Sequence, residues 1–449
     1  MRILLATDQP FWQRRGGAHQ RIDSLWAAIC GLSRPMDDDA DSLIYFLGDP
    51  NDVESANFPR QLGQIHAVRS QRSAWSKIWR AWRSSWSWRQ SGAELEARDT
   101  TNVDAASSVQ ELTLSDYCWT WVAQDWNKTL QAFEPDVVIL EYVTMTYLQK
   151  LALPEARRRI VWAVDTHDCL SERAAQFRKA GQAHWLNITE SEEIAALESV
   201  DLVIAIQDLE RKWFEQRLTK PQVLTVEHGP KELAVASPRT ASERGASLAE
   251  SVAGQERAAP LRIGFLASNN FPNRHGILNW LDSVAFNLSS MSVELLVGGT
   301  IAGEIYDFLS KDGRVSAFRS QVRALGPVSD LAEFYRSIDV SLCPIEVGTG
   351  LKIKLVESLA FGVPVLASPQ AASETLTAER GVVVCRTPTE WLDHLHRMIE
   401  DRDYLRNLQA AAYRYAECAC APSIVYGDLM QCLHTLVAAK AIANEAEQP

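Results

Sequence analysis

Two glycines, two lysines and a glutamate stand close together in the segment GTGLKIKLVESLAFGVPVLAS, which runs from residue 348 to residue 368. Gly348 and Gly350 let the backbone take unusual dihedral angles and approach a ligand closely. The following LVESLAFG is expected to form a helix, and the free N–H groups and positive dipole end of a helix N-terminus favour phosphate. Lys352 and Lys354 add two ammonium groups, so the segment predicts a site for a phosphorylated ligand.

Glu357 lies about one turn into the predicted helix, where its carboxylate can accept hydrogen bonds from two neighbouring hydroxyls. Cations for phosphate and a carboxylate for hydroxyls together point to a nucleotide, with a diphosphate at one end and a ribose at the other. The alternative is that both lysines are solvated and Glu357 is an ordinary residue of the helix surface. A Walker-type phosphate loop is excluded, because its motif does not occur in the chain.

A second glycine pair follows the first apolar run, in RILLATDQPFWQRRGGAHQRIDSLWAAI. The expected order is strand, glycine loop and helix, so Gly16 and Gly17 would again let the backbone approach a ligand beside a helix start. Basic side chains surround the pair, namely Arg14, Arg15, His19 and Arg21. Glycine pairs also occur in ordinary turns, which is the alternative interpretation.

Three polar residues, Asp165, His167 and Asp168, end the apolar run VWAVDTHDCL. A metal site is one interpretation, but no further cluster of ligands accompanies them. A general-base pair is another. In the structural alternative, His167 caps the following helix LSERAAQF or hydrogen-bonds to the backbone.

The residues that could do chemistry follow apolar runs that indicate strands. In the first half these runs are RILLATD, SLIYFLGD, DVVILEY, RIVWAVDTHD, DLVIAIQD and QVLTVEHG. Unbroken runs of this kind suit strands buried on both faces, and their alternation with helical patterns predicts a doubly wound α/β domain. Residues 230–260 are rich in Ala, Ser, Glu and Arg and are expected to form a linker or exposed insertion.

A second α/β series begins at residue 261. Its strand candidates are LRIGFLAS, VELLVGG, VSAFRSQ, DVSLCPI, VPVLAS and GVVVC, and the chain from residue 390 onward is expected to be helical, with a break near Pro422. Ligands of such sheets bind beyond the carboxyl ends of the strands. The sequence therefore predicts two α/β domains with a cleft between them, lined by the residues described above.

GTGLKIKLVESLAFGVPVLAS resembles the C-terminal-domain signature of the group 1 glycosyltransferases, retaining enzymes of the GT-B fold. GFLASNNFPNRHGILNWL is similar to the strand, loop and helix that open that domain, and LGPVSDLAEFYRSIDVSLCPIEVGTG to the segment leading to the signature. The resemblance covers most of the C-terminal half. It implies two Rossmann-like doubly wound domains facing a central cleft. We expect residues 1–229 on the acceptor side, with a helix in 423–449 packing back on them, and residues 261–422 as the nucleotide-sugar-binding domain.

The resemblance also implies roles for single residues. It places Glu357 on the donor ribose, and His167 against the donor sugar or its phosphate. With Lys352, His167 is expected to act by holding the reacting geometry and stabilising the departing diphosphate, while the acceptor attacks on the face that the diphosphate leaves. The expected donor-binding set is Gly16, Gly17, Arg274, Gly348, Thr349, Gly350, Leu351, Lys352, Lys354 and Glu357. No metal and no cofactor is expected, because the nucleotide sugar is a substrate.

The chain departs from the family pattern at two places. The family often has a glutamate that contacts the transferred sugar where this chain has Thr349. Its domain-opening loop often holds an Arg and a Lys for the diphosphate where this chain has Ser268 and His275. We expect Lys352 and Lys354, with Arg274, to supply that charge, so that replacing Lys352 with Ala lowers turnover by orders of magnitude and leaves the fold intact.

The segment SQRSAWSKIWRAWRSSWSWRQ places Trp75, Trp79, Trp82 and Trp86 at helical spacing among basic residues. A basic amphipathic helix with interfacial tryptophans is typical of one that lies on an anionic membrane surface. There are two alternatives. The tryptophans pack on the N-terminal domain, or they stack on a carbohydrate acceptor.

The composition restricts the remaining classes of function. The 449 residues carry a net charge of −12, which argues against a nucleic-acid partner. Eight scattered cysteines without a Cys-x-x-Cys pair suit a reduced, cytoplasmic protein. No apolar run has the pattern of a signal peptide or of a membrane span. The expected location is the cytoplasm, with peripheral attachment to the inner face of the cytoplasmic membrane under the membrane interpretation.

The sequence thus predicts a retaining glycosyltransferase. It would move a sugar from a nucleotide donor to a saccharide or lipid-linked acceptor, in cell-envelope or exopolysaccharide assembly. Two rivals stay open: a GT-B sugar-nucleotide epimerase, and a non-catalytic nucleotide-sugar-binding protein, which Thr349 favours.

Overall fold

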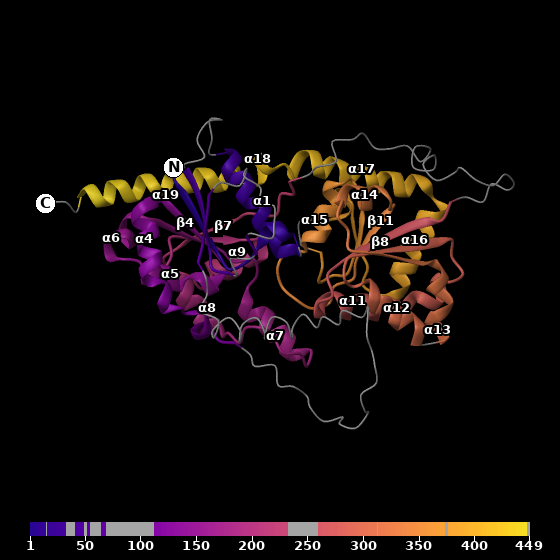
Figure 1. Ribbon diagram of the computed structural model, residues 1–449. Helices are drawn as coiled ribbons and strands as arrows, with labels where there is room; N and C mark the ends of the chain where they lie inside the picture. Colours follow the sequence, from indigo (N-terminus) through magenta and orange to yellow (C-terminus); the bar gives the residue numbers. More distant parts are fainter. Residues whose placement is uncertain are drawn as a thin grey trace, which may run out of the picture.

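A computed structural model gives the fold of the protein (Figure 1). It describes residues 1–14, 16–32, 41–48, 52–53, 64–68, 112–231, 259–311, 313–372 and 376–446. Trp75, Trp79, Trp82 and Trp86 lie outside these residues, as do Arg15 and most of the expected linker at 230–260. What the sequence predicts for these positions therefore stays a prediction.

Among the described residues, seven parallel strands form the N-terminal sheet, in the order β3-β2-β1-β4-β5-β6-β7. They are β1 (Ile3–Thr7), β2 (Ser42–Phe46), β3 (Gln64–Ala67), β4 (Val137–Glu141), β5 (Val161–Asp165), β6 (Leu202–Ala205) and β7 (Gln222–Thr225). Strand β1 pairs with both β2 and β4, so Ile3 lies opposite Ser42 and Val137. The strand order reverses between β1 and β4, which is where sheets of this kind bind ligands at their carboxyl edge.

The N-terminal sheet is buried on both faces. In β1, Leu4 and Ala6 belong to the core on one face, and Ile3 and Leu5 to the core on the other. Successive residues of a strand point to opposite faces, so an unbroken apolar run requires a cover on each side. The α-helices among the described residues of this half are α1 (Gly17–Leu32), α4 (Ala123–Phe133), α5 (Tyr147–Leu151), α6 (Pro154–Arg159), α7 (Leu170–Lys179), α8 (Glu190–Leu197) and α9 (Asp208–Glu215).

The C-terminal half repeats this architecture. Its six strands among the described residues are parallel, in the order β10-β9-β8-β11-β12-β13. They are β8 (Leu261–Leu266), β9 (Val293–Gly298), β10 (Val322–Gly326), β11 (Val340–Cys343), β12 (Val365–Ala367) and β13 (Val382–Val384). The helices around them are α11 (Phe271–Leu288), α12 (Ala302–Lys311), α13 (Gly313–Ser316), α14 (Leu331–Arg336), α15 (Ile353–Ala360) and α16 (Pro388–Glu400). The sequence prediction of two α/β domains built on parallel sheets is confirmed.

The last helices connect the two domains (Figure 1). Helix α17 (Arg402–Ala419) packs on the C-terminal domain, and α18 (Pro422–Val425) follows after a bend. Helix α19 (Gly427–Ala446) then runs along the N-terminal domain, where Leu429 and Leu433 are buried in the same core as β1. No helix of the described residues is long and apolar enough to span a bilayer.

Two local predictions need correction. The run VSAFRSQ, residues 315–321, was expected to be a strand, but it ends α13 and forms a 3-10 helix, Ala317–Gln321. Its buried residues Val315 and Phe318 are three apart, which suits a helical turn rather than the alternation of a strand. The strand β10 follows immediately, and β3 at the sheet edge was not predicted.

Candidate functional site

The loop of residues 348–350 joins β11 to α15 and lies against the N-terminal domain. Gly348 and Gly350 have φ values of +109° and +75°, which other residues rarely adopt. The Gly348 amide donates a hydrogen bond of 2.8 Å to Oε1 of Gln176 in α7. A Cβ on Gly350 would lie only 2.3 Å from Oδ1 of Asp168. The loop therefore needs both glycines for their backbone angles. It also needs Gly350 for the close contact between the domains.

Thr349 faces a carboxylate that the sequence did not place there. Its Oγ1 lies 3.1 Å from Oδ1 of Asp168 and 3.3 Å from the carbonyl oxygen of Cys169. Asp168 also forms an ion pair with Arg173. The N-terminal domain thus brings a carboxylate beside the position where the family pattern has a glutamate and this chain has threonine.

Lys352 is turned toward its own loop. Its ammonium donates to the carbonyl oxygens of Gly348, Thr349 and Gly350, at 3.2, 2.8 and 2.8 Å. Burial lowers the pKa of Lys352, while the charge of Asp168 opposes that shift. The sequence predicts this ammonium at a diphosphate, with no part in the fold. In the structure its hydrogen bonds hold the glycine loop together.

Lys354, in the first turn of α15, reaches the N-terminus of α11, where Arg274 also lies. The ammonium of Lys354 donates to Oδ1 of Asn273 and stands 5.1 Å from the ring centre of Phe265. Burial lowers the pKa of Lys354 to about 8. Arg274, in the first turn of α11, forms no ion pair with any acidic residue of the described part of the chain. Lys354 and Arg274 therefore both lie close to the N-terminus of α11.

Glu357 lies in the second turn of α15 and is 6% exposed. It is close enough to Tyr335 for its charge, after burial, to raise the pKa of that phenol well above its ordinary value. Leu351 is buried in the core beneath the loop. Glu357 is thus a largely buried carboxylate behind the glycine loop, whereas Leu351 anchors that loop.

Three helices begin near this loop without an acidic residue in the first turn, namely α1, α11 and α15. An acidic side chain there would occupy the positive end of the helix dipole, which these helices leave to a ligand. Helices α1 and α15 meet across the domains, since a Cβ on Gly17 would lie 3.3 Å from Cγ1 of Ile353. A Cβ on Gly16 would meet nothing within 4 Å.

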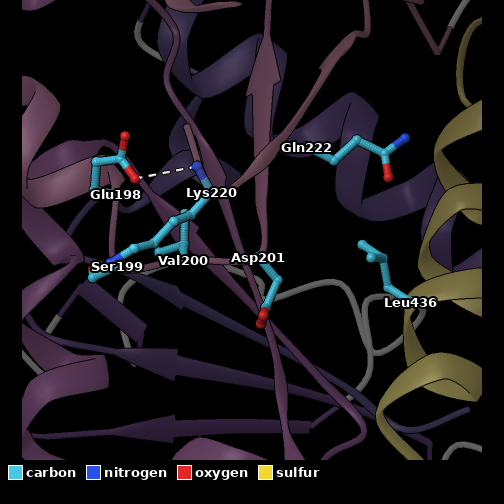
Figure 2. Close-up of a pocket in the computed structure, with 7 residues that line it drawn as sticks. All are labelled: Glu198, Ser199, Val200, Asp201, Lys220, Gln222 and Leu436. Atoms are coloured by element: carbon cyan, nitrogen blue, oxygen red, sulfur yellow. Dashed lines mark hydrogen bonds between the residues drawn. The ribbon is translucent and has the colours of Figure 1, made fainter. Parts of the chain in front are cut away.

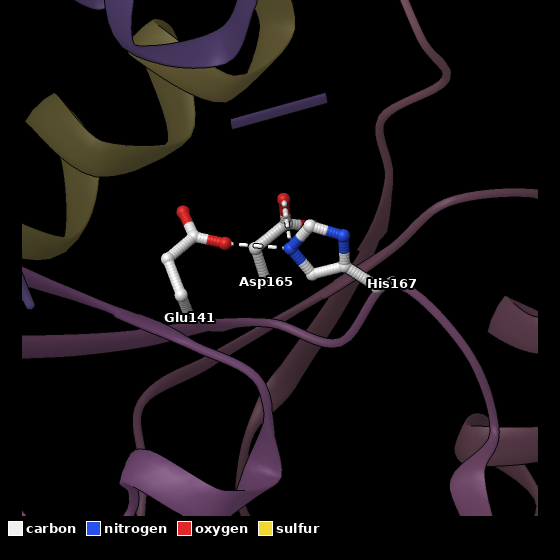
Figure 3. Close-up of side chains that lie close together, drawn as sticks. All are labelled: Glu141, Asp165 and His167. Atoms are coloured by element: carbon white, nitrogen blue, oxygen red, sulfur yellow. Dashed lines mark hydrogen bonds and ion pairs between the residues drawn. The ribbon is translucent and has the colours of Figure 1, made fainter. Parts of the chain in front are cut away.

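His167 stands at the centre of a buried polar cluster at the carboxyl ends of β4 and β5 (Figure 3). Its Nε2 lies 2.6 Å from Oε2 of Glu141 and 3.7 Å from Oδ2 of Asp165. The Tyr142 ring stacks on the imidazole, with ring centres 4.1 Å apart and planes inclined by 13°. Both Tyr142 and His167 have positive φ values, +68° and +59°, which are unusual for residues other than glycine. The expectation that His167 only caps α7 does not describe this environment.

Arg21 of α1 completes the cluster. Its Nε and Nη2 donate to the two carboxylate oxygens of Asp165 at 3.0 and 3.1 Å, and Nη1 donates to the Glu227 carbonyl at 2.5 Å. Glu141, Asp165 and His167 hold ligand-type atoms within 4.8 Å of one another. The guanidinium already neutralises Asp165, so the cluster contains its own cation and we assign no metal to it.

Sequence reasoning missed the roles of Glu141 and Tyr142, and noted Arg21 only as one of several basic residues. One signal was available, because Glu141 ends the apolar run DVVILEY just as Asp165 ends the next one. Charged residues at the carboxyl ends of neighbouring parallel strands meet at one edge of the sheet. Arg21 gave no comparable signal, because its pairing depends on how α1 packs over the sheet.

The N-terminal domain also has a pocket away from the glycine loop and His167 (Figure 2). It is lined by Glu198, Ser199, Val200, Asp201, Lys220, Gln222 and Leu436. Asp201 and Gln222 lie at the amino ends of β6 and β7, opposite the edge that holds His167. There the Asp201 carboxylate is paired with Lys440 of α19 at 2.7 Å. We therefore assign the functional site to the carboxyl edge.

The chain can now be compared with known proteins. Residues 260–401 match the family model described as glycosyl transferases group 1. No curated protein sequence matches the chain. Solved structures with the same fold include Anabaena Alr3699/HepE in complex with UDP, at 14% identity and a TM-score of 0.64, covering 97% of this chain and 100% of that one. Sucrose-phosphate synthase from Thermosynechococcus elongatus is similar at 14% identity and a TM-score of 0.65, with 98% and 100% covered.

A third structure is WaaG, a glycosyltransferase involved in lipopolysaccharide biosynthesis. It is 13% identical with a TM-score of 0.55, and the match covers 95% of this chain and 98% of that one. At these identities the likeness concerns the fold, which is the GT-B arrangement that the sequence predicted.

Proposed function

We propose that this chain, in which residues 260–401 match the family model described as glycosyl transferases group 1, transfers a sugar from a nucleotide-sugar donor to a saccharide or lipid-linked acceptor. One observation carries the proposal. The glycine loop 348–350 is surrounded by helix N-termini and basic side chains that suit a phosphate. It lies directly against the strand end that holds His167. A donor whose diphosphate lies at the loop would therefore present its sugar to the N-terminal domain.

The donor is held by the C-terminal domain in this proposal. The amide-rich starts of α15 and α11, with Lys354 and Arg274, bind the diphosphate, and Glu357 accepts hydrogen bonds from the ribose hydroxyls. Lys352 keeps the loop in shape for this binding. The N-terminus of α1, with Gly16 and Gly17, closes the phosphate site from the other domain.

The proposed reaction retains the configuration of the sugar, as the family resemblance implies. The bond between the anomeric carbon and the diphosphate oxygen breaks as a bond to the acceptor oxygen forms on the same face, so the configuration is retained. The acceptor proton passes to the departing diphosphate oxygen. His167 donates a hydrogen bond in the cleft, and developing charge on the diphosphate is stabilised by dipoles and cations that are already oriented. No metal and no cofactor takes part.

UDP-sugars are the first donors to test, because Anabaena Alr3699/HepE, which has the same fold, has been solved in complex with UDP and with UDP-glucose. A place in cell-envelope or exopolysaccharide assembly, in the cytoplasm or at the inner face of its membrane, is part of the proposal. It is supported by a similar fold in lipopolysaccharide glycosyltransferases. An acceptor would enter from the side of the N-terminal domain.

The test measures both binding and turnover. Thermal shifts with UDP, GDP and their sugars identify the nucleotide, because a ligand that binds only the folded state raises the unfolding temperature. Release of the nucleoside diphosphate from each bound donor is then followed with and without short saccharide acceptors. The proposal is supported if the nucleoside diphosphate is released slowly without acceptor, faster with acceptor, and not at all in Glu357→Ala. Binding without any release of diphosphate, or no binding at all, contradicts it.

A further inference from the structure

We propose that Glu141 is a positioning residue that keeps His167 as an imidazolium, with its Nδ1–H available to an anionic oxygen in the cleft. The inference rests on the proposed function, because the oxygen concerned would belong to the departing diphosphate or to the sugar attached to it. Neither Glu141 nor its partnership with His167 is part of the family pattern described above.

The hydrogen-bond geometry fixes one nitrogen. Nε2 of His167 lies 2.6 Å from Oε2 of Glu141, and a carboxylate can only accept, so Nε2 carries a hydrogen. The second ring nitrogen lies on the far side of the ring from both carboxylates (Figure 3). Nδ1 has no hydrogen-bonding partner among the described residues, and it is not among their fully buried polar atoms. Nδ1 is therefore the ring nitrogen of His167 that a ligand in the cleft can contact.

The balance of charge favours a protonated His167. Arg21 and Asp165 form a bidentate pair with both side chains 0% exposed, so they cancel each other. Glu141 is equally buried, and its Oε1 has no partner among the described residues. A neutral His167 would leave the Glu141 carboxylate without a counter-charge in the interior, which is costly. The protonated ring supplies that counter-charge.

The pKa of His167 agrees in direction with this state. Burial raises the pKa of Glu141 to about 7, and the hydrogen bond to His167 and the charges of His167 and Arg21 oppose that rise. Burial lowers the pKa of His167, but the charges of Asp165 and Glu141 and the hydrogen bond to Glu141 outweigh it and raise that pKa above its ordinary value. The nearby positive charge of Arg21 opposes the shift. The charged groups that face the cluster from the surrounding elements are Asp8 after β1, Arg21 from α1, Glu141 from β4, Asp165 and Asp168 from the end of β5, and Arg173 from α7.

Two further features suit an imidazolium. The face of the Tyr142 ring lies 4.1 Å from the imidazole, and aromatic faces attract cations. The positive φ values of Tyr142 and His167 are unfavourable by themselves and are held by the surrounding contacts. The backbone is thus bent to present a cationic ring at one place.

The test measures the His167 titration directly in the full chain. Histidine-selective ¹⁵N labelling follows the ring nitrogens across pH, and the His167→Asn variant identifies its signal. In Glu141→Gln, which keeps the size of the side chain and removes the charge, we expect the acid dissociation constant of His167 to rise at least tenfold. Glu141→Asp should restore part of the difference. Asp201→Asn, a paired carboxylate at the opposite edge of the same sheet, is the matched control and should leave the titration unchanged.

Activity gives the second readout. In the wild type, kcat should fall as pH rises through the pKa of His167, because the imidazolium is lost there. In Glu141→Gln this fall should occur at lower pH, with KM for the donor little changed and with kcat restored toward the wild-type value on the acid side. An unshifted His167 titration in a folded Glu141→Gln protein overturns the inference. A shifted titration in a protein that transfers no sugar overturns the proposed function instead, and leaves the pairing intact.

Discussion

The ammonium of Lys352 is an example of a single side chain whose role is set by its geometry. It donates to three consecutive carbonyl oxygens of the glycine loop, at residues 348, 349 and 350. Carbonyl groups that converge in this way need a donor, and burying them unpaired costs about 1–3 kcal/mol. The charge that the sequence suggests for a phosphate therefore acts first on the loop.

Replacing Lys352 with Ala should loosen the loop. We expect amide hydrogen exchange at residues 348–351 to become faster, the free energy of unfolding to fall by about 1–3 kcal/mol, and donor turnover to fall at least tenfold. Lys354→Met is the comparison, because the Lys354 ammonium contacts Asn273 and not the loop carbonyls. It should weaken donor binding while exchange at 348–351 stays as in the wild type. Equal exchange in the two variants would show that Lys352 does not hold the loop.

Residue types in this site could be predicted from the sequence, but their partners could not. Gly348, Gly350 and Glu357 were found because glycine and carboxylate stand at a fixed distance from a helix start. The contact between Thr349 and Asp168 joins positions 181 residues apart, and Lys354 meets Asn273 over 81 residues. Such pairs depend on the docking of whole domains or helices, and no local pattern records that docking.

At the scale of the element, the contact of α1 with α15 is close enough to test by one methyl group. A Cβ on Gly17 would meet Ile353 at 3.3 Å, which is tighter than ordinary van der Waals contact. Gly17→Ala should push the two helix N-termini apart by a few tenths of an ångström. Gly17 is the first residue of α1, where alanine gains less than the about 1 kcal/mol it gains over glycine in a helix interior, so stability should change little while transfer falls severalfold.

Gly31→Ala is the matched control for this change. It lies in the same helix, and a Cβ there would meet nothing within 4 Å. Its helix-stabilising effect should be similar, with transfer unchanged. Unchanged transfer in Gly17→Ala as well would mean that the distance between α1 and α15 does not matter for turnover.

Elements were predictable where the hydrophobic pattern was unambiguous. Unbroken runs such as those of β1, β4 and β5 are buried throughout and were recognised as strands. The edge strand β10 was misplaced by a few residues, because its residues are mostly exposed and the helical turn before it is more apolar. At a sheet edge, pairing with one neighbour decides the structure more than the local pattern does.

At the scale of the whole molecule, buried neutral histidines should make the N-terminal domain sensitive to acid. Burial lowers the pKa of His184 and of His228 to about 3, and Arg21 adds to the effect at His228. Both residues are 1% exposed. The unfolded chain binds these protons near an ordinary pKa of about 6.5, so stability falls as pH drops below that value toward 3. At pH 5 the loss is about 2 kcal/mol for each histidine relative to pH 7.

Urea unfolding followed by tryptophan fluorescence at pH 7 and pH 5 checks this prediction. His228→Leu should remove about half of the loss, because the ring nitrogens of His228 have no partner among the described residues and only their protonation is at stake. His434→Leu, at an exposed position of α19, should change nothing. If the free energy of unfolding falls between pH 7 and pH 5 as much in His228→Leu as in the wild type, the acid sensitivity comes from other groups.

The hydroxyl of Tyr426 accepts a hydrogen bond of 3.1 Å from the amide of Gly229. These residues belong to the two places where the chain passes between the domains, after β7 and between α17 and α19. Because this contact joins the two passages, the domains stay linked at one place, and any opening of the molecule has to turn about that place. Opening then breaks the contacts of the glycine loop with Gln176 and Asp168 while the chain crossings stay together, so the site can admit a substrate without the domains coming apart.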